Sequence, residues 1–324
     1  MSVSKVGTPL FILLSLILPS TGLTEFSWKD ESGKHLDLFF GDRAVSRFVY
    51  EAIDESSKER REETYKPFCH IYRWWSKDQF LTKGPGGKFT HHRGIFYGFS
   101  KVSYNDAKGN TYSKIDTWHC RQAAQIHREF LAREASAEYA TLTSRIEWTD
   151  NDGKPFAEET RSLTFQYKGG DLYVDFDSLL SPLVPEIRLD GDPQHAGFQF
   201  RASNEVHEST AKKTYYIRPG TGAAKPGETI NWSNKNDTEA TRDLPWKGMC
   251  VEVGEKRYTI AYLDHPDNPK PARYSERDYG RFGSYFATTV TDESPLEVRY
   301  RLVIRQGEMT KEDIESFQTE FVSS

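Results

Sequence analysis

The sequence is poor in sulfur, with three cysteines and three methionines among 324 residues. Cys69, Cys120 and Cys250 form no Cys-x-x-Cys pair, which argues against a closed zinc site built on thiolates. Three cysteines allow at most one internal disulfide in an exported protein. A nucleophilic thiolate needs a neighbouring base, and Cys120 follows a histidine. Cysteines are nevertheless more often small buried residues than nucleophiles.

Several functional signatures are also missing. The chain has no Gly-x-Ser-x-Gly turn for a nucleophilic serine, no phosphate-cradling glycine loop and no His-Glu-x-x-His helix. Its formal net charge of -5 offers no basic surface for nucleic acid. Beyond residue 22 no apolar run approaches the length of a membrane span. We therefore expect no nucleic-acid partner and no integral membrane segment in the mature chain.

The first 22 residues are typical of a secretory signal. Lys5 supplies a positive charge, an apolar core runs from Pro9 to Leu18, and small residues follow at 20–22. The alternative, an uncleaved membrane anchor, is disfavoured because the apolar core is short. We predict a signal peptide at 1–22, one β-sandwich domain at 23–324, and a secreted or periplasmic location.

Short alternating runs separated by turn residues dominate the rest of the chain. Asp150–Gly153 and Lys168–Asp171 are strong hairpin turns, and no run of alternating strands and helices appears. The pattern predicts an all-β protein, a large antiparallel β-sandwich, with a short C-terminal helix over 310–322 that begins at Thr310.

Three stretches are less regular. Residues 51–66 are highly charged and predict a solvated loop or a frayed helix. Residues 122–137 fit a helix or a strand equally. Residues 207–243 are polar and rich in glycine and threonine, which predicts a long lid or edge loop.

The two-residue period of strands assigns side chains to faces. Glu159 and Arg161 fall on the same face as the apolar residues that follow them, a position expected for the rim of a pocket. Gln199 and Arg201 share one face, while Phe198 and Phe200 share the other. Gln199 and Arg201 therefore face either a polar concavity or solvent.

Residues 89–121 carry the densest set of reactive side chains. His91, His92 and Arg93 precede a stiff aromatic run, and Asp116 and His119 follow one hairpin later. Imidazoles bind metals, transfer protons near neutral pH and hydrogen-bond sugars. Adjacent histidines in a regular strand would point to opposite faces. We predict that at least two of His91, His92 and His119 share a site.

Four clusters have the same character, each beside glycine or proline at a strand end or in a loop. They are His91-His92-Arg93, Asp116 with His119, His195 with Gln199 and Arg201, and Asp264-His265 with Arg277-Asp278. Such groups, interleaved with tryptophan and tyrosine, suit a carbohydrate ligand.

Two chemistries are open for a glycoside. One is a carboxylate pair drawn from Glu159, Asp116, Asp264 and Asp278. The other is a divalent metal held by histidines, with a carboxylate or a histidine moving the proton. The competing structural interpretations are loop histidines bonded to backbone at 195 and 265, and a salt bridge between residues 277 and 278.

Taken in order, several of these motifs resemble the PmoA-like family of exported bacterial proteins, also called methane oxygenase-like. The motifs are His91-His92-Arg93-Gly94, Asp116-x-Trp118-His119, Gly191-Asp192, Gly197-x-Gln199-x-Arg201, Trp246-Lys247-Gly248, Asp264-His265-Pro266-x-Asn268-Pro269 and Arg277-Asp278-Tyr279-Gly280. The resemblance spans roughly residues 66–305 and implies a galactose-mutarotase-like supersandwich. It also implies an association with sugar oxidoreductases and keto-glycoside hydrolases or lyases in polysaccharide degradation. A methane monooxygenase is not expected, because that activity needs several apolar spans.

Three functions follow as hypotheses. The first is an exported glycoside hydrolase or lyase acting on glycosides, including 3-keto glycosides; the second is a sugar epimerase or mutarotase; the third is a non-catalytic glycan-binding sandwich. The predicted catalytic residues are His91, His92, His119, Glu159 and Asp264, with His91 and His119 as ligands of a possible divalent metal. The predicted substrate-binding residues are Arg93, Asp116, Trp118, His195, Gln199, Arg201, His265, Arg277, Asp278 and Tyr279.

Overall fold

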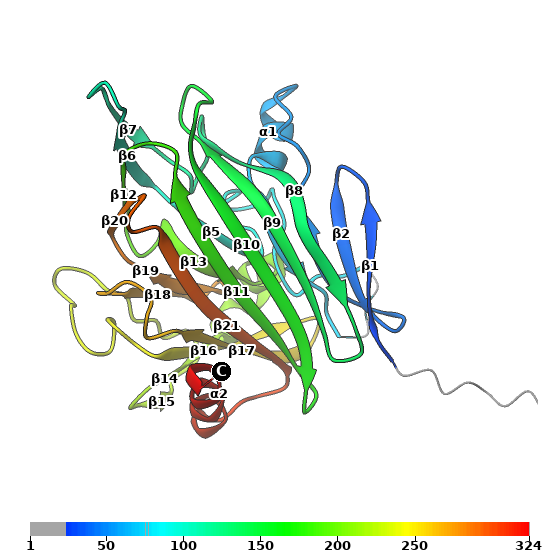
Figure 1. Ribbon diagram of the computed structural model, residues 1–324. Helices are drawn as coiled ribbons and strands as arrows, with labels where there is room; N and C mark the ends of the chain where they lie inside the picture. Colours follow the sequence, from blue (N-terminus) through cyan, green and yellow to red (C-terminus); the bar gives the residue numbers. More distant parts are fainter. Residues whose placement is uncertain (1–23, 75, 77, 324) are drawn as a thin grey trace, which may run out of the picture.

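The computed structural model describes residues 24–74, 76 and 78–323, so the predicted signal peptide lies outside the described residues. Strands dominate (Figure 1). The helical elements are α1 (Lys58–Thr64), the π-helical turn η1 (Val206–Thr210), the 3-10 turn η2 (Ala211–Lys213) and α2 (Lys311–Ser323). No helix within these ranges is long and apolar enough to cross a membrane.

The strands form three sheets. The first contains β1 (Phe26–Glu31), β2 (His35–Phe40), β3 (Arg43–Val49), β4 (Phe68–Ile71), β5 (Ile95–Phe99), β13 (Ala196–Arg201), β19 (Arg281–Tyr285) and β18 (Arg273–Arg277), in that spatial order. The second contains β15 (Gly222–Ala223), β14 (Tyr215–Arg218), β16 (Trp246–Val253), β17 (Lys256–Asp264), β21 (Leu296–Gln306), β11 (Asp171–Pro182), β10 (Pro155–Lys168), β9 (Tyr139–Thr149) and β8 (Ala124–Ala135), again in spatial order. The small third sheet contains β20 (Thr288–Thr291), β12 (Glu186–Asp190), β6 (Lys101–Asn105) and β7 (Thr111–Ile115). Every pairing between these strands is antiparallel.

The eight-stranded and nine-stranded sheets pack face to face around an aromatic core. The Phe198 ring of β13 lies 4.4 Å from Phe176 of β11 and 4.7 Å from Tyr300 of β21, measured between ring centroids. Tyr97 of β5 packs on Trp148 of β9 at 5.9 Å. These contacts join the inner faces of the two sheets, which confirms the predicted all-β antiparallel sandwich.

The C-terminal helix covers the other face of the nine-stranded sheet. Ile314 and Phe321 of α2 belong to an apolar cluster with Trp246 and Leu263 of β16 and β17. The Thr310 hydroxyl accepts the Asp313 backbone N–H at 3.1 Å, the cap that the sequence predicts.

The three less regular stretches adopt different structures. Within 51–66 the segment Lys58–Thr64 is a helix capped by Ser57, and residues 124–135 are strand β8 rather than helix. The prediction of one long lid or edge loop at 207–243 is wrong, because η1, η2, β14 and β15 lie in this stretch and β14 pairs with β16. The three cysteines are free and buried, as small core residues are; burial raises the pKa of the Cys120 thiol to about 11, which disfavours a thiolate.

His70, buried on β4, makes folding sensitive to acid. Its ring stacks on Phe80 at 3.9 Å, and burial, then the charge of Arg47, lower its pKa to about 3. Between pH 6.5 and 3 the His70 imidazole is therefore protonated in the unfolded chain and neutral in the folded chain. The free energy of unfolding consequently falls as the pH falls through this window. Lowering the pH from 6.5 to 5 should reduce the free energy of unfolding of His70→Gln by about 2 kcal/mol less than it reduces that of the wild type. Urea denaturation at the two pH values measures the difference.

The matched control is His207→Gln, at a partly exposed position. Equal pH slopes for His70→Gln and the wild type would show that His70 does not carry the effect.

Candidate functional site

The site lies over the outer face of the eight-stranded sheet. Phe198 and Phe200 of β13 point into the sandwich core, so the alternation of the strand turns Gln199 and Arg201 to the opposite face. Both are fully buried, because loops cover this face. Of the two predicted environments for them, exposure to solvent is therefore not what the structure shows.

Three loops bring three histidines together above this face. His91 comes from the segment before β5, His119 from the loop after β7, and His195 from the loop before β13. One ligand-type atom from each lies within 4.8 Å of the other two. The ring centroids are 4.4 Å apart for His91 and His119, and 5.0 Å apart for His119 and His195. The predicted pair His91 and His119 therefore gains His195, which was expected only to bind substrate.

Two carboxylates orient two of the rings. Asp116 Oδ2 lies 2.7 Å from His119 Nδ1, and both Asp192 oxygens lie 3.1 Å from His195 Nδ1. Burial raises the pKa of Asp116, but its hydrogen bonds from His119 outweigh this and hold the pKa below its ordinary value. A carboxylate that accepts Nδ1–H leaves Nε2 with a free lone pair, the arrangement of metal-binding histidines.

The neighbouring His92 also turns toward this region. Its ring centroid lies 4.3 Å from that of His91, which is possible because residues 91 and 92 are in a turn and not in a strand. Nε2 of His91 and both ring nitrogens of His92 are buried without a hydrogen-bond partner. Burial lowers the pKa of His91 to about 2 and that of His92 well below its ordinary value, so both imidazoles stay neutral.

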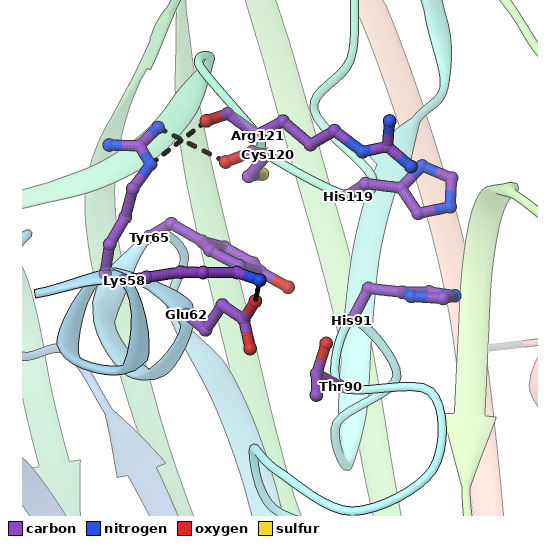
Figure 2. Close-up of a pocket in the computed structure, with 9 residues that line it drawn as sticks. Lys58, Glu62, Tyr65, Thr90, His91, His119, Cys120 and Arg121 are labelled. Atoms are coloured by element: carbon purple, nitrogen blue, oxygen red, sulfur yellow. Dashed lines mark hydrogen bonds and ion pairs between the residues drawn. The ribbon is translucent and has the colours of Figure 1, made fainter.

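A cavity of about 440 Å³ opens beside His91 and His119. Figure 2 shows their imidazoles pointing the same way on one side of the cavity, with Glu62 and Tyr65 near α1 on the other. Arg61 of α1 donates to the Cys120 and Gln122 carbonyls at 3.2 and 2.7 Å, which ties the helix to the His119 loop. Helix α1, predicted only as a solvated or frayed segment, therefore forms a wall of the cavity.

Several predicted substrate-binding residues support the site from beneath. Arg93 donates to the Glu62, Glu63 and Thr90 carbonyls, so it caps the C-terminal end of α1. Trp118 is fully buried against Phe96 of the sheet. Arg93 and Trp118 thus hold α1 and the histidine loop in place.

Other predicted residues line the adjoining part of the sheet face. The Tyr279 ring lies under the Arg201 guanidinium at 5.0 Å. Gln199 accepts a hydrogen bond from Arg281 Nη1 at 2.8 Å. Arg277 donates to Asn231 and to the Glu276 carbonyl, so the alternative of an Arg277–Asp278 salt bridge is not what the structure shows.

Four predicted residues lie apart from the histidines. Glu159 is buried between the sheets, where it accepts from Trp148 and Ser178 and pairs with Arg161 at 2.7 Å, so it lines no pocket rim. Asp264 is buried among Tyr274, Asn268 and Ser284. The His265 ring packs on Phe321 of α2 at 5.4 Å. Asp278 is exposed.

The sequence-based selection missed four residues of this region: Asp192, Arg281, Glu62 and Tyr65. Asp192 had a signal, since Asp116-x-x-His119 and Asp192-x-x-His195 share one spacing. Arg281 is opposite Arg201 on the neighbouring strand, a relation that only the strand pairing reveals. Glu62 and Tyr65 lay in the stretch predicted as solvated.

The fold and the site together define an all-β sandwich protein with a three-histidine cluster on the outer face of one sheet. The chain belongs to the DUF6807 family, described as a family of unknown function, whose model matches residues 35–318. A comparison with curated proteins gives no match.

Solved structures with similar folds include carbohydrate-related proteins. The chain is similar to the GH36 alpha-galactosidase AgaB from Geobacillus stearothermophilus, with a TM-score of 0.42 and 8% identity over 88% of this chain and 41% of that one. It is also similar to a galactose mutarotase related enzyme from Lactobacillus acidophilus, with a TM-score of 0.36 and 8% identity over 88% of this chain and 99% of that one. A galactose mutarotase-like protein from Lactobacillus casei gives a TM-score of 0.35 and 10% identity over 86% and 100% of the two chains. The chain spans about two fifths of the length of the alpha-galactosidase.

Proposed function

We propose that the protein is an exported carbohydrate-active enzyme, a glycoside hydrolase or lyase whose substrates include 3-keto glycosides, and that it uses a divalent metal held by His91, His119 and His195. One observation carries the proposal. Three imidazoles, two of them oriented by carboxylates, converge within 4.8 Å beside a cavity large enough for a sugar ring.

The donor set fits a divalent transition metal. Neutral imidazoles suit zinc, iron, copper and nickel, and three histidines with an open position are typical of catalytic rather than structural zinc sites. Such a metal polarises a carbonyl or hydroxyl oxygen of the substrate. The low pKa of His91 is consistent with this role, because only the neutral ring has a lone pair to donate.

Glu62 and Tyr65 are the groups of the cavity wall that suit proton transfer. The Glu62 side chain is partly exposed and lies 3.9 Å from Lys58 Nζ, and the Tyr65 hydroxyl is buried without a hydrogen-bond partner. Both line the same cavity as His91 and His119. In this proposal Glu62 is the general acid or base, in place of the distant Glu159 and Asp264.

Export and the PmoA-like resemblance belong to the same proposal. The predicted signal at 1–22 would leave residues 23–324 as the mature single domain. Secretion into the medium or periplasm, with an N-terminus near residue 23 by protein sequencing, is the expected result. An uncleaved N-terminus in the membrane fraction would contradict it.

Metal content and turnover test the function together. We expect about one zinc ion per chain by elemental analysis, and cleavage of native or 3-keto glycosides that stops after chelation and returns with zinc. His119→Ala should lose the metal and at least a hundredfold in kcat/KM. The control His207→Ala, outside the cluster, should keep both.

The Asp–His pairs also suit metal-free proton transfer, which keeps a sugar epimerase or mutarotase as the second candidate. Turnover that survives chelation and gives epimers without cleavage would favour it. Sugar binding without turnover, unchanged in His119→Ala, would instead leave a non-catalytic glycan-binding sandwich.

A further inference from the structure

A pair of buried arginines without carboxylate partners lies next to the histidine cluster. Arg201 of β13 and Arg281 of β19 are directly opposite in the strand register and point to the same outer face. Both are 0% exposed. Arg277 of β18 is in turn opposite Arg281, so three guanidinium groups follow one another across three strands.

The hydrogen bonds of this pair are incomplete. Arg201 Nη1 donates to the Ala202 and Tyr279 carbonyls, and Arg281 Nη1 to Gln199 and Ser275. Nε and Nη2 of both arginines are buried without a hydrogen-bond partner, as are both ring nitrogens of His92. Among the described residues neither arginine forms an ion pair with a carboxylate.

Like charges directly opposite each other on neighbouring strands repel, and buried charges without partners are costly. Burial, with the charge of Arg281 adding to it, lowers the pKa of Arg201 to about 10. Buried Lys83 also lies nearby. Burial, and then the charges of Arg201 and Arg93, lower its pKa to about 7, and its amine donates to the Gly84, Gly86 and His92 carbonyls. An anion bound here would pair with the unused guanidinium donors and offset the repulsion.

We propose that Arg201 and Arg281 form an anion subsite that holds the carboxylate of an acidic sugar, a uronic acid residue, beside the three-histidine cluster. A carboxylate is planar and presents two oxygens, which matches the donor fork of a guanidinium group. His92 links the two parts, because its ring centroid lies 4.3 Å from that of His91 and 6.3 Å from that of Tyr279.

This inference rests on the proposed function only in taking the anion to be part of a sugar. The subsite would sort substrates by charge, so the enzyme would act on uronide-containing rather than neutral glycans.

Thermal shift and calorimetry on the full mature chain test it, at constant ionic strength and with zinc present. The probes are methyl glucuronide, methyl glucoside, glucose 6-sulfate and sodium sulfate. We expect methyl glucuronide to raise the Tm by a few degrees and methyl glucoside to leave it unchanged. Arg281→Met should weaken glucuronide binding at least tenfold without lowering the Tm of the free protein, since it removes one of two repelling charges.

Arg281→Lys keeps the charge and loses the fork, so it provides a second variant if Arg281→Met fails to fold; its glucuronide binding should also weaken at least tenfold. The matched control is Arg273→Met. Arg273 is four residues from Arg277 along β18, and the guanidinium group of Arg273 stacks on Trp232. Arg273→Met should bind glucuronide as the wild type does.

The proposal is overturned if methyl glucoside binds as well as methyl glucuronide, or if Arg281→Met and Arg281→Lys both bind glucuronide normally. It is also overturned if sodium sulfate alone gives the same shift, or if glucose 6-sulfate binds better than glucuronide, which would assign the subsite to sulfate. If His119→Ala still binds glucuronide, the inference of an anion subsite stands even if the proposed metal-dependent function is wrong.

Discussion

Glu276→Gln is expected to lower the free energy of unfolding by about 3–5 kcal/mol, because it removes the anion that two buried cations share and leaves Lys247 without its carboxylate partner. Glu276 of β18 is fully buried and pairs with Arg218 of β14 at 2.7 Å and with Lys247 of β16 at 2.8 Å. It also accepts the Ile230 backbone N–H at 2.8 Å. This carboxylate therefore ties the eight-stranded sheet to two strands of the nine-stranded sheet and to the 219–245 connection.

The charge state of the cluster supports this size of effect. Burial raises the pKa of Glu276, but Lys247 and Arg218 outweigh it and hold the pKa below its ordinary value. Glutamine has the same shape and no charge, so the loss reports the ion pairs and not a cavity. Urea denaturation of the wild type and the variant at pH 7 measures it.

Two further variants separate the causes. Glu228→Gln removes a half-exposed partner of the same Arg218, at 2.7 Å, and should cost under about 1 kcal/mol because water screens the pair. The double variant Glu276→Gln/Lys247→Met also removes the cation that the single variant leaves unpaired, and should regain part of the loss. A Glu276→Gln protein as stable as Glu228→Gln would refute the account.

The sequence predicts which strand residues share a face, but it does not predict what covers that face. Alternation correctly separates Gln199 and Arg201 from the core-facing Phe198 and Phe200. The same rule places Glu159 with apolar residues, but a pocket rim and the inside of a sandwich look alike in one strand. Glu159 proves to be a core carboxylate neutralised by Arg161, which only the second sheet reveals.

The histidine cluster shows the opposite case. His91, His119 and His195 are separated by long stretches of chain, yet their residue types and loop positions were sufficient to select all three as site residues. The sequence also predicted that at least two of His91, His92 and His119 share a site, as His91 and His119 do. The addition of His195 was not predictable, because it depends on how three loops fold over one sheet. Arg281 was missed for the same reason: its importance comes from its position opposite Arg201 across the strands.

Asp116→Asn and Asp192→Asn should each weaken zinc binding by about ten- to a hundredfold, and together by more. Asp116 Oδ2 lies 2.7 Å from His119 Nδ1, and Asp192 lies 3.1 Å from His195 Nδ1. An asparagine amide that donates to Nδ1 would move the ring proton to Nε2 and remove the lone pair from the side that faces the metal. The fold should change little, since the asparagine in either variant keeps a side-chain oxygen for the backbone N–H groups that donate to the aspartate.

Competition with a chelating dye measures the zinc affinity, and cobalt substitution gives a visible spectrum that reports ligand geometry. Asp190→Asn is the matched control, because Asp190 is two residues from Asp192 and its replacement removes the same charge without touching a histidine. Zinc affinity that falls equally in Asp190→Asn would mean that total charge, and not ring orientation, governs binding. Affinity unchanged in both Asp116→Asn and Asp192→Asn would show that the three histidines do not bind the metal through the nitrogens that these carboxylates leave free.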